Sequence, residues 1–115
     1  MKLKHLRKAA EFAEILRNCE KIRESRVSVF FRRHCSPGGL FVGIIISKKT
    51  EPLATRRNYM RRVIYSVCGE KEDSSRKKTE MIVRVDGKTS GKGRKALYSE
   101  LRRNLKNALK KIGEQ

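Results

Sequence analysis

Residues 40–69 read LFVGIIISKKTEPLATRRNYMRRVIYSVCG, and this stretch decides the fold. Residues 40–46 are apolar on both alternating faces, which is typical of a strand in the interior of a sheet. Lys48 and Lys49 then form a basic connection. Over about residues 56–68, apolar side chains recur at the spacing of one helical face, namely Met60, Val63, Ile64 and Val67. The stretch therefore predicts a buried strand and a helix that packs by this face.

The same periodicities predict the remaining elements. Residues 8–20 have the apolar spacing of an amphipathic helix, and residues 26–34 alternate as a strand with one buried and one partly open face. Residues 81–85, MIVRV, predict a further strand. Residues 95–112 predict a last helix with a basic outer face. Residues 70–80 show no apolar pattern, so we expect a mobile loop there.

These elements combine into one α+β domain, an α/β sandwich, over residues 1–115. We expect a small central sheet of about four strands, covered by three helices. A short fourth strand is expected near residues 20–25 or 33–36.

The charge of the chain favours a nucleic-acid partner. Lys and Arg total 30 against 12 Asp and Glu, which gives a formal net charge of +18. Such a charge destabilises a small domain through self-repulsion unless a polyanion neutralises it. Solubility alone needs only about 2–8 net charges. No apolar run approaches the ~20 residues that span a bilayer, so we expect no membrane partner.

The N-terminus and the cysteines predict a cytoplasmic protein. The sequence MKLKHLRKAAEF contains no apolar signal core. Cys19, Cys35 and Cys68 are odd in number and far apart, so they cannot all pair within one chain.

No set of residues predicts a catalytic or metal site on the protein. GKTSGKG at residues 87–93 departs from a phosphate-binding loop in both its spacing and its last residue, so a flexible cationic loop is expected. His5 and His34 are far apart in sequence, and no His, Cys, Asp and Glu residues have metal-ligand spacing. We therefore assign no catalytic residue and no metal ligand.

Residues 47–62, SKKTEPLATRRNYMRR, form the strongest candidate RNA-binding segment. They hold six basic residues and one acidic residue. Lys and Arg neutralise phosphates and release counterions, and Arg also grips phosphate with a planar pair of donors. A merely solvated helix would intersperse Glu to form pairs one turn apart, but residues 56–68 contain no acid.

The block VGIIISKK (42–49) and, seven residues later, RNYMRRVI (57–64) resemble the signature of the bacterial ribonuclease P protein family. That family shows a glycine-containing strand ending in a small residue and two lysines. A helix then reads Arg-Asn-Arg, an apolar residue, Lys or Arg, and Arg. This chain has Tyr59 where the family usually has the third residue, Arg, and Tyr65 where another Arg is common. Leu16 replaces a second aromatic of the first helix.

The resemblance implies a fold with a left-handed β-α-β crossover built around the signature helix, against the usual hand. It also implies that this helix and the lysines before it bind the catalytic RNA. The residues that correspond to this surface are Lys48, Lys49, Arg56, Arg57, Asn58, Tyr59, Arg61, Arg62 and Tyr65.

A second RNA surface is implied between the first helix and the sheet, where the family holds the single-stranded 5′ leader of precursor tRNA. The alternation at residues 26–34 supplies a floor for such a cleft, because Ser28, Phe30 and Arg32 share one face. Phe12 and Leu16 of the first helix would close one side. Unpaired bases stack on aromatic rings at about 1–3 kcal/mol per base. Core positions for Phe12 and Phe30 remain an alternative.

The implied function is that of the protein subunit of ribonuclease P, which promotes endonucleolytic removal of the 5′ leader from precursor tRNA. Catalysis would belong to the RNA subunit and to Mg²⁺ held by that RNA. The expected partners are ribonuclease P RNA and precursor tRNA, with no obligate protein partner evident. The alternative is a non-enzymatic ribosomal or rRNA-binding protein, which is also small, basic and α+β.

Overall fold

The computed structural model describes residues 4–70, 77–87, 89 and 93–113. Eight elements follow one another along the chain: β1 (Lys4–His5), α1 (Ala9–Arg17), β2 (Glu20–Arg23), β3 (Val27–Pro37), β4 (Leu40–Ile45), α2 (Ala54–Glu70), β5 (Lys77–Val85) and α3 (Arg94–Gly113). The α+β class and the three predicted helices are confirmed. The sheet has five strands in the described part of the chain, not about four.

The strand order in the sheet is β1-β4-β5-β3-β2. β3 runs antiparallel to β2 and β5, and β4 runs parallel to β1 and β5. α2 connects β4 to its parallel neighbour β5, so the predicted β-α-β connection is present. Its left hand remains the expectation that the family resemblance carries.

The structure differs from the sequence-based expectation at two strands. β1 has only two residues, too few to show an alternating pattern, and it went unpredicted. The loop expected over residues 70–80 is wrong at Glu70, which is the last residue of α2, and from Lys77 onward, because β5 begins there. This polar half of β5 pairs with β3 on one side and with β4 on the other, so backbone hydrogen bonds hold it without an apolar pattern. Residues 71–76 of the expected loop lie outside the described residues.

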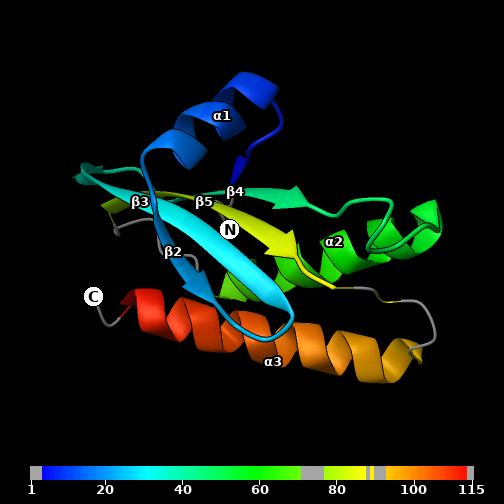
Figure 1. Ribbon diagram of the computed structural model, residues 1–115. Helices are drawn as coiled ribbons and strands as arrows, with labels where there is room; N and C mark the ends of the chain where they lie inside the picture. Colours follow the sequence, from blue (N-terminus) through cyan, green and yellow to red (C-terminus); the bar gives the residue numbers. More distant parts are fainter. Residues whose placement is uncertain (1–3, 71–76, 88, 90–92, 114–115) are drawn as a thin grey trace.

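Helices cover both faces of the sheet, as Figure 1 shows, with α1 on one face and α2 and α3 on the other. The larger core lies under α2 and α3 and includes Phe31, Met60, Ile64, Met81, Leu101 and Leu105, which are 0–1% exposed. A smaller buried cluster, Leu6, Ile15 and Ile82, lies under α1. None of the helices in the described part is long and apolar enough to cross a membrane.

α1 approaches β4 at Gly43. A Cβ atom at this position would overlap Cζ of Phe12, well inside van der Waals contact. The absence of a side chain at Gly43 is therefore what lets the Phe12 ring rest directly on the backbone of β4.

Candidate nucleic-acid interface

The carboxylate of Glu51 organises the start of α2. Glu51 is only 2% exposed. It accepts hydrogen bonds from the Leu53 backbone N–H (3.1 Å), Arg56 Nε (2.7 Å) and the Thr89 hydroxyl (2.6 Å). Burial opposes ionisation, but these donors outweigh it and hold the pKa of Glu51 below its ordinary value. Glu51 thus ties the start of α2 to the segment that precedes α3.

Thr89 corrects the expectation of a flexible loop over residues 87–93 at one position. Its side chain is fully buried, and its backbone N–H donates to the Thr50 carbonyl at 3.0 Å. Lys88 and residues 90–92 of that loop lie outside the described residues.

Arg56 and Arg57, both predicted to contact RNA, also hold this helix start in place. Arg57 Nη1 donates to the carbonyl oxygens of Glu51 and Pro52, each at 2.9 Å. Both arginine side chains are half-buried. Their guanidinium groups are therefore oriented before any RNA arrives.

The other predicted polar residues of α2 lie at its surface. Asn58 and Arg62 are exposed, and half-buried Arg61 donates to Asn58 Oδ1 at 3.2 Å. Lys48 and Lys49 are exposed in the turn between β4 and α2. Over residues 56–68, which contain no acid, the helix therefore presents its basic side chains outward, as the sequence predicts.

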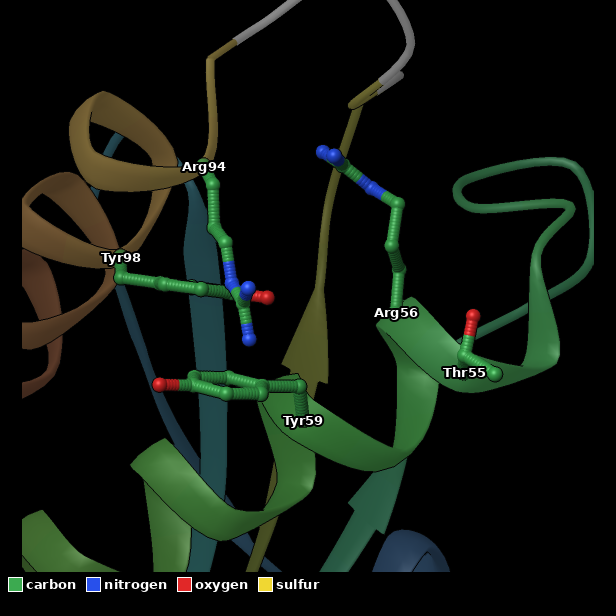
Figure 2. Close-up of a pocket in the computed structure, with 5 residues that line it drawn as sticks. All are labelled: Thr55, Arg56, Tyr59, Arg94 and Tyr98. Atoms are coloured by element: carbon green, nitrogen blue, oxygen red, sulfur yellow. The ribbon is translucent and has the colours of Figure 1, made fainter.

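The two tyrosines of α2 each stack on a ring from another element. Tyr59 lies against Tyr98 of α3 with ring centroids 4.4 Å apart, and the Arg94 guanidinium is 4.2 Å from the Tyr59 centroid (Figure 2). Tyr65 stacks on His5 of β1 at 3.9 Å, and burial raises the pKa of the Tyr65 hydroxyl. The sequence pattern could not predict the stacking partners His5 and Tyr98, because they are more than 35 residues away from the tyrosines along the chain.

On the opposite face of the sheet, the structure corrects the assignment of Ser28. It lies on the predicted face of β3 but is 0% exposed. Its hydroxyl donates to Asp86 Oδ2 at 2.6 Å, and Arg84 Nη2 lies 3.4 Å from Ser28 Oγ. Ser28 therefore lies beneath the surface of this face, where its hydroxyl holds Asp86, and it is not accessible to a ligand.

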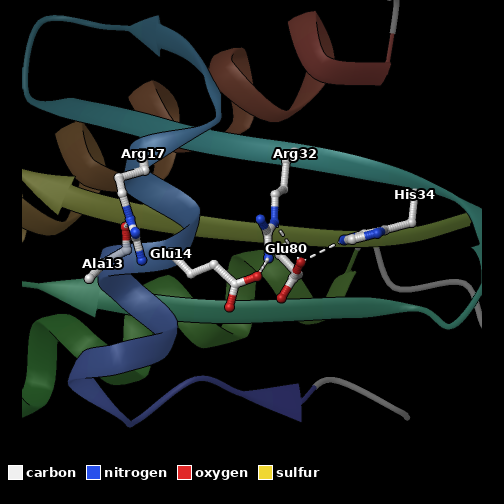
Figure 3. Close-up of polar contacts among 6 residues, drawn as sticks. All are labelled: Ala13, Glu14, Arg17, Arg32, His34 and Glu80. Carbon is white, nitrogen blue, oxygen red and sulfur yellow. Dashed lines mark hydrogen bonds and ion pairs between the residues drawn. The ribbon is translucent and has the colours of Figure 1, made fainter.

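Arg32 is engaged in a network of ion pairs at the edge of α1. Its Nε lies 2.8 Å from Glu80 Oε1, and its Nη2 lies 3.2 Å from Glu14 Oε1 (Figure 3). His34 Nε2 approaches the same Glu80 oxygen at 2.6 Å. Burial opposes ionisation of Glu80, but the hydrogen bonds from Arg32 and His34 outweigh it and hold its pKa below the ordinary value.

The aromatic side chains on this face are accompanied by cations that the sequence reasoning missed. Half-buried Phe30 has Lys21 Nζ at 5.3 Å and the Arg84 guanidinium at 5.2 Å from its ring centroid. Phe41 of β4 is flanked in the same way by Lys4 and Lys78. The signal for Arg84 was present in the alternation of MIVRV, which places it on the face of Ile82.

The two α1 residues predicted for this face have different environments. Phe12 is half-buried over Gly43, whereas Leu16 is 43% exposed. Beyond the end of α1, a cavity of about 420 Å³ is lined by Asn18, Cys19, Glu20, Phe31, Arg32, Arg33 and His34. Of the five predicted cleft residues, Arg32 borders this cavity.

The basic outer face of α3 is partly neutralised by ion pairs. Arg102 and Lys106 lie 3.5 Å and 3.9 Å from the carboxylate of Glu70, and Lys111 pairs with Glu24. Among the residues that the structure describes, no group of three or more His, Cys, Asp or Glu side chains is placed to hold a metal ion.

Comparisons with known proteins bear on the whole chain. A protein-family model described as Ribonuclease P matches residues 1–113. The RNase P protein of Staphylococcus aureus has a TM-score of 0.78 at 20% identity, with 96% of each chain covered. That of Thermotoga maritima, in complex with 1-(4-fluorophenyl)-2-thiourea, has a TM-score of 0.76 at 24% identity, covering 91% of this chain and 96% of that one. No curated protein sequence matches. The likeness to the solved structures is one of fold.

Proposed function

Since the chain belongs to the ribonuclease P protein family, whose model matches residues 1–113, we propose that its two sheet faces serve two different RNAs. As a member of this family it is a protein subunit of the endoribonuclease that matures the 5′ end of tRNA. The family match is the observation that carries this conclusion. The division of labour between the two faces is our proposal.

The proposed surface for the catalytic RNA is the outer side of α2 with the turn before it. Its members are Lys48, Lys49, Arg56, Arg57, Asn58, Tyr59, Arg61, Arg62 and Tyr65. Support comes from the arginines that Glu51 and the helix-start carbonyls hold in fixed orientations. Pre-oriented guanidinium groups lose less side-chain entropy when they bind phosphate.

The proposed surface for the 5′ leader of precursor tRNA is the α1 face, with Phe12, Leu16, Phe30 and Arg32 as contacts and Ser28 as a buried support. Support comes from Phe30, whose ring stands between the cations of Lys21 and Arg84. A ring that can stack, beside charges that can bind phosphate, suits single-stranded RNA of any sequence.

In this proposal the protein works in the cytoplasm and contributes binding, not bond cleavage. The RNA subunit and the Mg²⁺ that it holds would activate water and stabilise the leaving oxygen. The basic chain would screen phosphate repulsion between the catalytic RNA and its substrate.

Reconstitution tests the proposal. The purified chain, treated with nuclease to remove RNA, should leave precursor tRNA intact. Addition of a bacterial ribonuclease P RNA should give cleavage at a low Mg²⁺ concentration at which that RNA alone is inactive. Cleavage by the RNA-free protein, or no gain over the RNA alone, would refute it. Co-purification with ribosomal RNA instead would favour the rRNA-binding alternative.

A further inference from the structure

A small pocket lies where the N-terminal ends of α2 and α3 meet. Its volume is about 300 Å³, at the lower limit of the about 300–1,000 Å³ typical of small-ligand sites. Figure 2 shows the five residues that line it, Thr55, Arg56, Tyr59, Arg94 and Tyr98. Two guanidinium groups, two phenol rings and a hydroxyl therefore surround one hollow.

The two rings form a stacking platform that remains partly open to solvent. Tyr59 and Tyr98 are nearly parallel, at 11°, and Tyr59 is 37% exposed. The Arg94 guanidinium lies 4.2 Å from the Tyr59 centroid and 5.8 Å from the Tyr98 centroid. Stacked aromatic rings beside an arginine are the groups with which proteins hold unpaired bases.

One wall of the pocket, Arg56, is held from behind by the carboxylate of Glu51. Glu51 Oε1 accepts from Arg56 Nε at 2.7 Å and from the Thr89 hydroxyl at 2.6 Å. Arg56 is one wall, and Thr89 lies in the connection that leads into Arg94 at the start of α3. The Arg56 wall is therefore oriented before a ligand binds, and Thr89 is held beside it.

We propose that this pocket binds one unpaired nucleotide of the catalytic RNA, with its base against the tyrosines and its phosphate at Arg94 and Arg56. A paired base has both faces covered by its neighbours in the helix and cannot offer a face to Tyr59. A bare phosphate would use the arginines but leave the rings without a role. The inference rests on the proposed function, because it names a contact of the same RNA partner.

The test measures binding of a bacterial ribonuclease P RNA to the full chain over a range of salt concentrations. Tyr59→Leu keeps an apolar side chain but removes the ring, and should weaken binding about 5–150-fold with little change in salt dependence. Arg94→Ala should weaken binding and lower the log–log salt slope by about 0.7–0.9. Ultraviolet crosslinking of the wild-type complex should join Tyr59 or Tyr98 to a single nucleotide.

Arg103→Ala is the matched control, because Arg103 is an exposed arginine of the same helix outside the pocket. Melting temperatures of all variants should agree, since Arg94 and Tyr59 are exposed at the surface. If Tyr59→Leu binds like Arg103→Ala, the nucleotide pocket is refuted, even where Arg94→Ala still lowers the slope. In that case the proposed function would stand as long as the wild-type chain still supports cleavage of precursor tRNA. A wild-type chain that neither binds this RNA nor supports cleavage would refute the proposed function as well.

Discussion

At the scale of single residues, Phe30 decides whether the α1 face is a core or a binding surface. Its ring packs beside the buried cluster of Leu6, Ile15 and Ile82 and is itself only half-buried. Phe30 therefore combines the two environments that the sequence left open, a core position and an accessible position on the α1 face. Only a change that removes the ring separates them.

Phe30→Ala should lower the affinity of the reconstituted holoenzyme for leader-bearing precursor tRNA by about 1–3 kcal/mol, because one base loses its stacking partner. Affinity for mature tRNA should hardly change. Phe30→Leu restores apolar volume without the ring, so it should regain stability but not leader affinity. Equal losses for both tRNAs, together with a large fall in melting temperature, would instead identify Phe30 as core.

Glu80 predicts a pH dependence of stability. Its pKa lies below the ordinary 4.5 because Arg32 and His34 donate to the carboxylate. The unfolded chain therefore takes up this proton first as the pH falls, so stability from Glu80 is full above about pH 4.5 and is lost below it. Urea unfolding between about pH 3 and pH 6 measures the free energy of unfolding. This free energy should fall less steeply with decreasing pH for Glu80→Gln than for wild type. An unchanged pH dependence would mean that the network is not formed in solution. Glu51 has a lowered pKa too, so some slope should remain in the variant.

Sequence alternation correctly placed Ser28, Phe30 and Arg32 on one face of β3, but not their surroundings. Which of them is buried depends on β5 and α1, which supply Asp86 to Ser28 and Glu80 and Glu14 to Arg32. These partners lie 18 to 58 residues away in sequence. No local pattern encodes contacts of that range.

At the scale of elements, α2 is the helix whose buried and exposed sides the sequence predicts most directly. Its buried stripe and its basic outer face over residues 56–68 were both predicted, because the side on which each residue lies follows from helical spacing alone. Its start was not: the helix begins at Ala54, two residues before the expected 56, held by Glu51 and Thr89. Similarly, α1 ends at Arg17, short of the expected residue 20, because Glu20 already belongs to β2.

Replacing Arg61 and Arg62 together by Ala should weaken binding of ribonuclease P RNA and flatten its log–log salt dependence by roughly 1–2 units. The fold should persist, since neither residue belongs to the core beneath α2. The control is the double change Arg102→Ala and Lys106→Ala on α3, which removes the same charge from residues paired with Glu70. Equal effects of the two double variants would show that total charge, not the α2 surface, governs binding.

At the scale of the whole molecule, the net charge of +18 sets how the fold responds to its medium. Ion pairs such as Arg26 with Glu100 offset only some of the repulsion. Raising the salt concentration from about 0.1 M to 1 M shortens the screening length from about 10 Å to 3 Å, which weakens repulsion between distant cations.

The melting temperature of the protein without RNA should therefore rise with salt, and sulfate should raise it more than chloride at equal ionic strength. Thermal unfolding followed by circular dichroism measures both trends. A melting temperature that falls with added salt would show that the surface ion pairs contribute more than the repulsion.

The position of β5 also has a consequence for synthesis on the ribosome. β3 and β4 are consecutive in the chain, yet β5 lies between them in the sheet. Of the strands that the structure describes, a nascent chain that ends before residue 77 holds two pairs, β2 with β3 and β1 with β4, and the strand that joins them in the sheet is still missing. Neither pair can complete a core until β5 leaves the exit tunnel and bridges them. For most of its translation, this strongly basic polypeptide therefore emerges unfolded beside ribosomal RNA, the competing polyanion from which it must escape.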